Sequence, residues 1–218
     1  MNPGIGFRTT LVAAFCIALA VAASGQPAKV EVLNSLSATG ASDEMKQALD
    51  GKGYRVTLAD GWTADFWFAK ELKTAQKDSP GALYPELSNA EFVGVVNLPK
   101  GMSDFRGQAI PSGTYTLRYQ YLPQDANHMG VSPNPDFLLA IPIASDQNPA
   151  AKYLFRKLVS LSAQTTGSHP AVIALDTAGE PGNVAESQKT LILTVAVSTG
   201  ESGTIEKLGI VIRGQATQ

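Results

Sequence analysis

Residues Thr114–Tyr121 read TYTLRYQY, and this stretch decides the class of fold. Aromatic or aliphatic side chains stand at every second position from Tyr115, and polar side chains stand between them. A period of two places each set on its own face of an extended chain, so the odd positions predict a buried face. The preceding Pro111-Ser112-Gly113 favours a tight turn, because proline fixes φ and glycine accepts a positive φ. The sequence therefore predicts a β-strand entered from a turn.

Short apolar segments bounded by turn residues recur on both sides of this strand. The segment Asp136–Ile143 reads DFLLAIPI and is apolar on both faces, which predicts a central strand, with Pro142 marking an edge or a bulge near its end. Residues 74–90 are expected to form an excursion over the surface. The other expected strands are Lys29–Leu33, Tyr54–Leu58, Ala64–Lys70, Glu91–Leu98, Ala171–Leu175, Thr190–Val197 and Thr204–Arg213.

Two segments follow a helical pattern. In Ser42–Asp50, the serine is expected to cap the helix N-terminus, and a glycine follows its end. After Asn148, Pro149 suits the first helical position, and apolar residues then recur at helical spacing. A second, amphipathic helix is therefore expected near residues 149–164.

These elements predict a mainly β protein with a single domain over residues 26–218. We expect one antiparallel β-sandwich of about nine strands, of the immunoglobulin or transthyretin type, with one inserted amphipathic helix and one short helix. The composition agrees with a folded domain, because 44% of the residues are hydrophobic and only 17% are charged.

The first 25 residues are expected to be a secretory signal peptide. The apolar run Leu11–Ala23 follows the single cation Arg8 and leads into Ala23-Ser24-Gly25, a small-residue exit suited to cleavage. The run is too short for a permanent membrane anchor. The sequence thus predicts export to the periplasm or the medium. Because the only cysteine is Cys16, the exported chain would be cysteine-free.

The net charge of −2 argues against nucleic acid as a partner, since no basic field is available to hold a phosphate backbone. No G-x-S-x-G, P-loop, H-E-x-x-H or dinucleotide-binding glycine pattern occurs in the sequence. The sequence therefore favours a non-catalytic role, although it does not decide against an enzyme.

The segment 123–136 (PQDANHMGVSPNPD) concentrates polar residues between two expected strands. Asp125, Asn127, His128 and Asp136 are candidate ligand-binding residues, because long loops held by a scaffold often carry sites. His128 and His169, with Asp125 or Asp136, could bind a divalent metal such as zinc, copper or iron if the two loops meet. The alternative is a structural loop held by Asx hydrogen bonds.

Two further residues are candidates for ligand contact. Trp62 follows Gly61 in an expected turn and is the tryptophan best placed for exposure, where it could stack on a sugar ring. Arg118 lies on the strand face opposite the tyrosines and could bind an acidic ligand or pair with Asp104. Burial in the core is the competing interpretation for the aromatic residues.

Four segments carry a resemblance to known proteins. IPSGTYTLRY begins at Ile110, NHMG at Asn127, DFLL at Asp136 and SHPAV at Ser168. Together they resemble segments of a group of exported bacterial β-domain proteins for which no activity is established. The resemblance implies export and a β fold, and it transfers no catalytic residue.

Two functional hypotheses follow. The first is an exported, non-catalytic β-sandwich module that binds a small ligand, a glycan or a protein partner. A cell-envelope component or a glycan is the partner that export favours. The second is a metal-binding protein or metal-dependent enzyme that uses the loop around His128.

Overall fold

A computed structural model describes Met1 and residues 28–74, 79–122, 130–187, 190–200 and 204–214. The helices are α1 (Asp43–Ala48), α2 (Phe155–Thr166) and the 3₁₀ turn η1 (Ile143–Ser145). The strands are β1 (Ala28–Leu33), β2 (Leu49–Leu58), β3 (Thr63–Ala69), β4 (Phe92–Leu98), β5 (Met102–Ser103), β6 (Ala109–Ile110), β7 (Gly113–Tyr121), β8 (Asp136–Pro142), β9 (Ala171–Asp176), β10 (Asn183–Ser187), β11 (Thr190–Thr199) and β12 (Thr204–Arg213).

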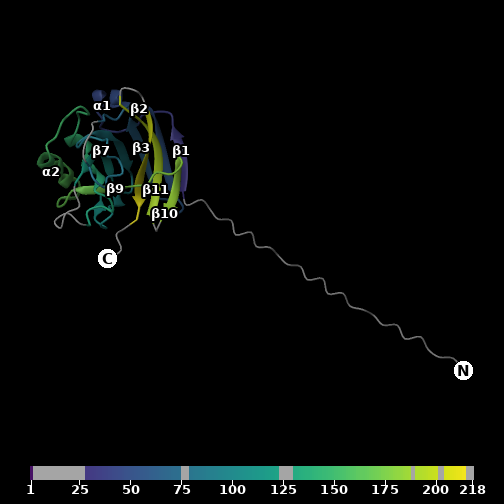
Figure 1. Ribbon diagram of the computed structural model, residues 1–218. Coiled ribbons are helices and arrows are strands. Elements are labelled where there is room, and N and C mark those ends of the chain that lie inside the picture. The colour runs from purple at the N-terminus through teal and green to yellow at the C-terminus, as the bar shows by residue number, and fades with distance from the viewer. Residues whose placement is uncertain (2–27, 75–78, 123–129, 188–189, 201–203, 215–218) are drawn as a thin grey trace.

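Ten strands form one antiparallel sheet in the order β1-β2-β3-β4-β7-β8-β9-β12-β11-β10. The chain builds the first seven as a meander, crosses to the far edge for β10, and returns through β11 and β12 to pair with β9. The edge strands β1 and β10 lie against each other, so the sheet curls nearly into a barrel (Figure 1). The hairpin β5–β6 stands apart from this sheet, between β4 and β7.

The prediction of a mainly β, antiparallel protein with one short and one longer helix is confirmed. The prediction of a two-sheet sandwich is corrected to one continuous, nearly closed sheet. The reason is the pairing of β12 with β9, where Gly209 lies opposite Asp176 and Ile210 opposite Leu175. This short ladder joins the C-terminal strands to the N-terminal meander.

The alternation in β7 correctly predicts which face of the strand carries the aromatic and aliphatic core residues. Tyr115, Leu117 and Tyr119 are buried in the main core inside the curled sheet. The apolar character of both faces of β8 also has a clear cause. Its inner face joins the same core, whereas Phe137, Leu139 and Ile141 on its outer face pack against Leu158 and Leu161 of α2. Helix α2 thus covers the outside of β8 (Figure 1).

Helix α1 begins as the sequence predicts, because the Ser42 Oγ accepts the N–H of Met45 at 3.1 Å. Helix α2 begins at Phe155, six residues later than Pro149. The backbone before it is held extended by Arg118, whose guanidinium donates to the carbonyl oxygens of Asn148 at 2.7 Å and Ala151 at 3.1 Å. Because these carbonyl oxygens accept hydrogen bonds from Arg118, they do not accept the backbone N–H groups that a helix would supply.

The described part of the expected surface excursion, residues 74 and 79–90, instead belongs to a segment that closes one end of the barrel. The Leu72 N–H donates to the Ser198 carbonyl at the end of β11, and Gly200 donates back to Leu72. Farther along, Tyr84 and Leu87 are buried in the main core. The turns β2–β3 and β4–β5 and the end of β12 lie at the opposite end of the barrel.

Candidate functional site

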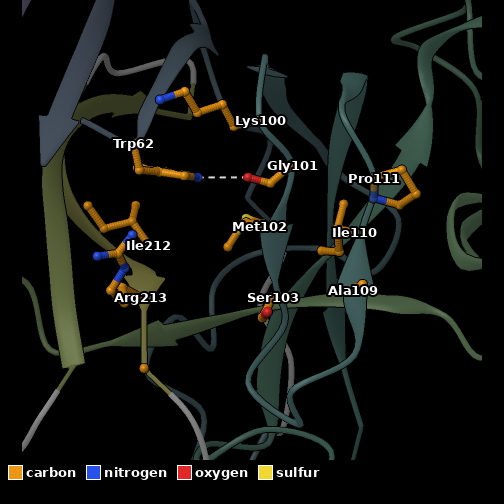
Figure 2. A pocket seen from close by; sticks show the side chains of 11 residues that line it. Trp62, Lys100, Gly101, Met102, Ser103, Ala109, Ile110, Pro111, Ile212 and Arg213 are labelled. Carbon is orange, nitrogen blue, oxygen red and sulfur yellow. Dashed lines mark hydrogen bonds between the residues drawn. The ribbon is translucent and has the colours of Figure 1, made fainter. Parts of the chain in front are cut away.

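A cavity of about 710 Å³ opens at the end of the barrel opposite the closing segment (Figure 2). Three parts of the chain form its walls. They are the residue Trp62 after the β2–β3 turn, the β4–β5 turn with the β5–β6 hairpin, and the last residues of β12. Its volume lies within the range of about 300–1,000 Å³ that is typical of small-molecule sites.

Trp62 is held in the cavity wall by its own turn and by a partner across the opening. Its backbone N–H donates to the Asp60 Oδ1 at 2.9 Å, and the turn is completed by Gly61 with a positive φ of 76°. Its Nε1 donates to the carbonyl oxygen of Gly101 at 2.7 Å. The side chain is therefore fixed in one orientation and buried in the main core, with 9% of the residue exposed, so the prediction that Trp62 is exposed is wrong.

The partner carbonyl depends on a glycine. Gly101 has a φ of 66°, and a Cβ on it would lie 2.5 Å from the carbonyl oxygen of Ile110. Only glycine combines this positive φ with so close an approach of the β6 backbone. The β5–β6 hairpin can thus pack tightly, with the Gly101 carbonyl directed at the indole.

Two cationic side chains flank the indole. The Arg213 Nη1 lies 2.6 Å from the Asp60 Oδ2, and its guanidinium carbon lies 6.0 Å from the centre of the Trp62 ring. The Lys100 Nζ donates to the carbonyl oxygen of Gly61 at 2.8 Å. Hydrogen bonds from the Trp62 N–H and from Arg213 lower the pKa of Asp60, so this carboxylate stays ionised beside the pocket.

The rest of the lining is mainly apolar. Met102, Ile110 and Ile212 present aliphatic surface, and Ser103 contributes a hydroxyl group. Apolar walls bury the body of a ligand, and a few fixed polar groups orient it. The arrangement is suited to holding a small molecule.

Of the singled-out residues that the structure describes, Trp62 alone lines this pocket. Asp125, Asn127 and His128 lie outside the described residues. Asp136 is fully buried, where its two carboxylate oxygens accept the N–H groups of Leu83 at 3.0 Å and Tyr84 at 2.9 Å. These contacts fix the closing segment to β8, which gives Asp136 a structural role.

Arg118 is also fully buried, and its partner is Asp146 instead of Asp104. The Arg118 Nε and Nη2 each lie 2.7 Å from one oxygen of Asp146, and Nη1 donates to the carbonyl oxygen of Ala90 at 2.9 Å. The Thr116 hydroxyl donates to the same carboxylate at 2.7 Å. The interpretation of Arg118 as a ligand-binding residue therefore gives way to a structural ion pair.

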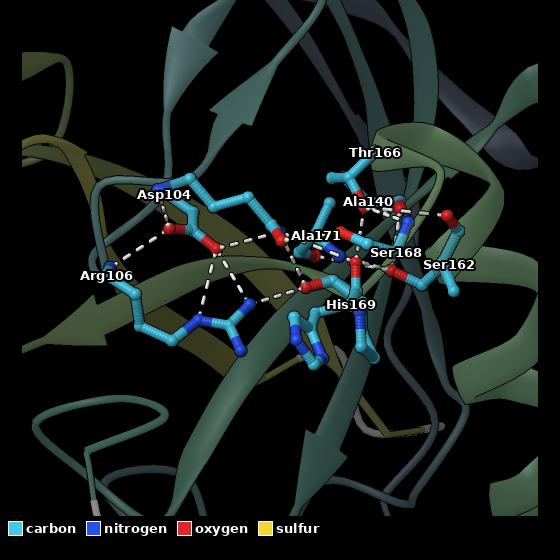
Figure 3. Close-up of polar contacts among 11 residues, drawn as sticks. Asp104, Arg106, Ala140, Ser162, Thr166, Ser168, His169 and Ala171 are labelled. Atoms are coloured by element: carbon cyan, nitrogen blue, oxygen red, sulfur yellow. Dashed lines mark hydrogen bonds and ion pairs between the residues drawn. The ribbon is translucent and has the colours of Figure 1, made fainter.

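His169 lies in a second polar cluster, on the outside of the sheet (Figure 3). Its carbonyl oxygen accepts from Thr166 Oγ1 at 2.5 Å, while its side chain belongs to an exposed residue. Asp104 is buried here and pairs with Arg106 at 2.8 Å. Within the ranges that the structure describes, no group of three or more His, Cys, Asp or Glu side chains is placed to hold a metal ion.

Ser162 of α2, in the same cluster, also has structural partners. The Ser162 Oγ donates to the Ala140 carbonyl at 2.9 Å and accepts the Ala171 N–H at 3.0 Å (Figure 3). Helix α2 is thereby fastened to β8 and β9.

Comparisons with protein-family models, with curated proteins and with solved structures find no match to this chain. The resemblance to exported bacterial β-domain proteins stays a prediction. None of the helices in the described ranges is long and apolar enough to cross a membrane.

No pattern in the sequence points to Lys100 or Arg213 as site residues. Neither residue belongs to a motif, and Arg213 meets Asp60 across 153 positions of the chain. The sequence signal for this turn was Pro99-Lys100-Gly101, because a proline and a glycine soon after an expected strand mark a turn.

Proposed function

We propose that this protein is an exported, non-catalytic β module that binds a small ligand in the Trp62 pocket. The observation that carries the proposal is the fixed indole in the wall of an open cavity of about 710 Å³, next to two cations and aliphatic side chains. Such a set of groups binds and orients a ligand.

The chemistry of the lining supports binding over catalysis. A general acid or base is usually a histidine or a carboxylate within hydrogen-bond reach of the reacting atom. The side chains that line this cavity are instead an indole, aliphatic groups, two cations and one hydroxyl group. A neutral glycan is included in the test below.

Export is supported by the apolar run Leu11–Ala23 and by the small residues after it. N-terminal sequencing of the protein recovered from the periplasm or the medium should begin near Gln26. Recovery of the folded protein with Met1 intact would contradict export with cleavage.

Ligand binding is tested by a thermal-shift screen of small acids, neutral apolar compounds and oligosaccharides. A ligand at about ten times its Kd should raise the Tm by about 3 to 6 °C. The shift should disappear in Trp62→Ala and weaken in Trp62→Phe, which keeps an aromatic ring but cannot donate to Gly101. Trp67→Phe is the matched control, because Trp67 is fully buried and does not line the cavity. Shifts that Trp62 substitutions leave unchanged would contradict the proposal.

A further inference from the structure

The two cations of the Trp62 pocket are held by neighbouring residues of one turn. Asp60 binds Arg213 at 2.6 Å, and the Gly61 carbonyl binds Lys100 at 2.8 Å. Among the described residues, these are the hydrogen bonds that the two side chains make. An ammonium group carries three donors and a guanidinium five, so both keep donors for another acceptor.

The charge of the pocket opposes that of the chain. The protein carries a net charge of −2, whereas the charged side chains that line the cavity, among the residues that the structure describes, are those of Lys100 and Arg213. Asp60 beside the pocket offsets one of these charges, which leaves an excess positive charge at the opening. Clefts with charge of one sign concentrate ligands of the opposite sign.

The inner surface of the cavity is suited to a ligand with an apolar part. Ile110 and Ile212 are buried core residues that also line the cavity, and Met102 of β5 lines it as a partly buried residue (Figure 2). A neutral sugar needs several hydrogen-bond partners, and within the described part of the chain Ser103 is the one hydroxyl side chain in the lining. Apolar surface beside exposed cations instead matches a molecule with an apolar part and an acidic group.

We infer that the pocket takes a small amphiphilic anion, whose carboxylate-type group binds Lys100 and Arg213 and whose apolar body lies against Met102, Ile110 and Ile212. This inference rests on the proposed function and specifies its ligand. Charge-assisted hydrogen bonds to arginine and lysine are stronger than neutral ones, which gives the site its preference for an acid.

The experiment is isothermal titration calorimetry with phenylbutyrate and with its neutral amide, phenylbutanamide. The acid should bind at least about tenfold more tightly than the amide, and added salt should reduce this difference. Lys100→Met and Arg213→Met should each weaken acid binding about five- to tenfold and leave amide binding unchanged. Lys100→Arg and Arg213→Lys should keep most of the preference, and Lys46→Met on α1 is the control for loss of a distant charge.

The outcomes separate this inference from the proposed function. Equal binding of acid and amide, both lost in Trp62→Ala, would overturn the anion preference and leave the pocket as a ligand site. The same holds if only a neutral oligosaccharide binds in a Trp62-dependent manner. Binding of the acid that survives Trp62→Ala and both methionine variants would overturn the inference and the proposed function together.

Discussion

Two arginines of this protein sit in opposite surroundings. Arg118 is fully buried, and its guanidinium meets both oxygens of Asp146 and several backbone carbonyls. Arg213 lies at the opening of a cavity, where its side chain is 44% exposed and binds one carboxylate. The first arginine has its donors matched by the fold, and the second has donors left over.

The different surroundings of Arg118 and Arg213 show how a structural polar group can be distinguished from a functional one. A buried charge costs free energy unless partners satisfy it, so the carbonyls of residues 148–151 and the carboxylate of Asp146 surround Arg118. An exposed cation carries no such requirement. Its free donors in a lined cavity are therefore available to a ligand.

The largest effect is expected at the buried pair. Asp146→Ala leaves the Arg118 guanidinium without its counter-charge in the interior and should lower the free energy of unfolding by about 3–5 kcal/mol. Urea denaturation measures the change. Asp43→Ala, which removes an aspartate with an 89% exposed side chain, should cost less than about 1 kcal/mol. A small effect of Asp146→Ala would show that the buried pair does not hold the fold.

The next effect concerns alkaline pH. Burial raises the pKa of Tyr84 from 10.0 to about 12, because the folded protein disfavours the phenolate. Its contribution is fully present below pH 10 and is lost as the pH rises through about 12, amounting to at most about 3 kcal/mol. Denaturation between pH 9 and pH 12 should show this loss.

Tyr84→Phe isolates this contribution, since it removes the phenol but keeps the ring. The variant gives up the hydrogen bond from the Gly209 N–H, at 2.7 Å, so it should be less stable at neutral pH. Its further loss of stability between pH 10 and pH 12 should be smaller than that of the wild type. Parallel curves for the two proteins would exclude Tyr84 as a source of the alkaline loss.

A smaller effect is expected at Asp136, which fixes the segment that closes the barrel. Asp136→Asn replaces one acceptor oxygen that faces a backbone N–H and should cost about 1–3 kcal/mol in unfolding free energy. Binding to the Trp62 pocket should persist, because Asp136 lies at the opposite end of the barrel. Loss of binding without loss of stability would restore Asp136 as a ligand residue.

The smallest effect on stability is expected at the pocket cations. Lys100→Met and Arg213→Met should each change the unfolding free energy by less than about 1 kcal/mol, because exposed ion pairs contribute little. Urea denaturation of both variants checks this. A cost of several kcal/mol would place Arg213 in the same structural class as Arg118.

Much of the sheet could be predicted from local pattern. The alternation in β7, the double apolar faces of β8 and the cap at Ser42 each depend on residues that are near in sequence. The joining of the C-terminal strands to the meander could not be predicted from local pattern, because it depends on the pairing of β12 with β9. Its signal was Gly209, where a Cβ would lie 2.4 Å from the Asp176 carbonyl oxygen.

The site was only partly predictable for the same reason. Trp62 was expected to be exposed because it follows a glycine in a turn, but it is buried in the main core and forms part of the cavity wall. The cations that complete the pocket come from β12 and from the β4–β5 turn, and no local pattern joins them to it. Short, polar β10 (NVAES) was missed because it lacks alternation.

A crystal structure of the protein with phenylbutyrate bound would show directly whether the Trp62 pocket holds an amphiphilic anion. We predict a definite pose. The ligand should lie in the cavity beside Trp62, with its carboxylate within hydrogen-bond distance of Lys100 or Arg213 and its phenyl ring against Met102 and Ile110. A ligand bound elsewhere on the molecule, or one whose carboxylate points away from both cations, would contradict this prediction.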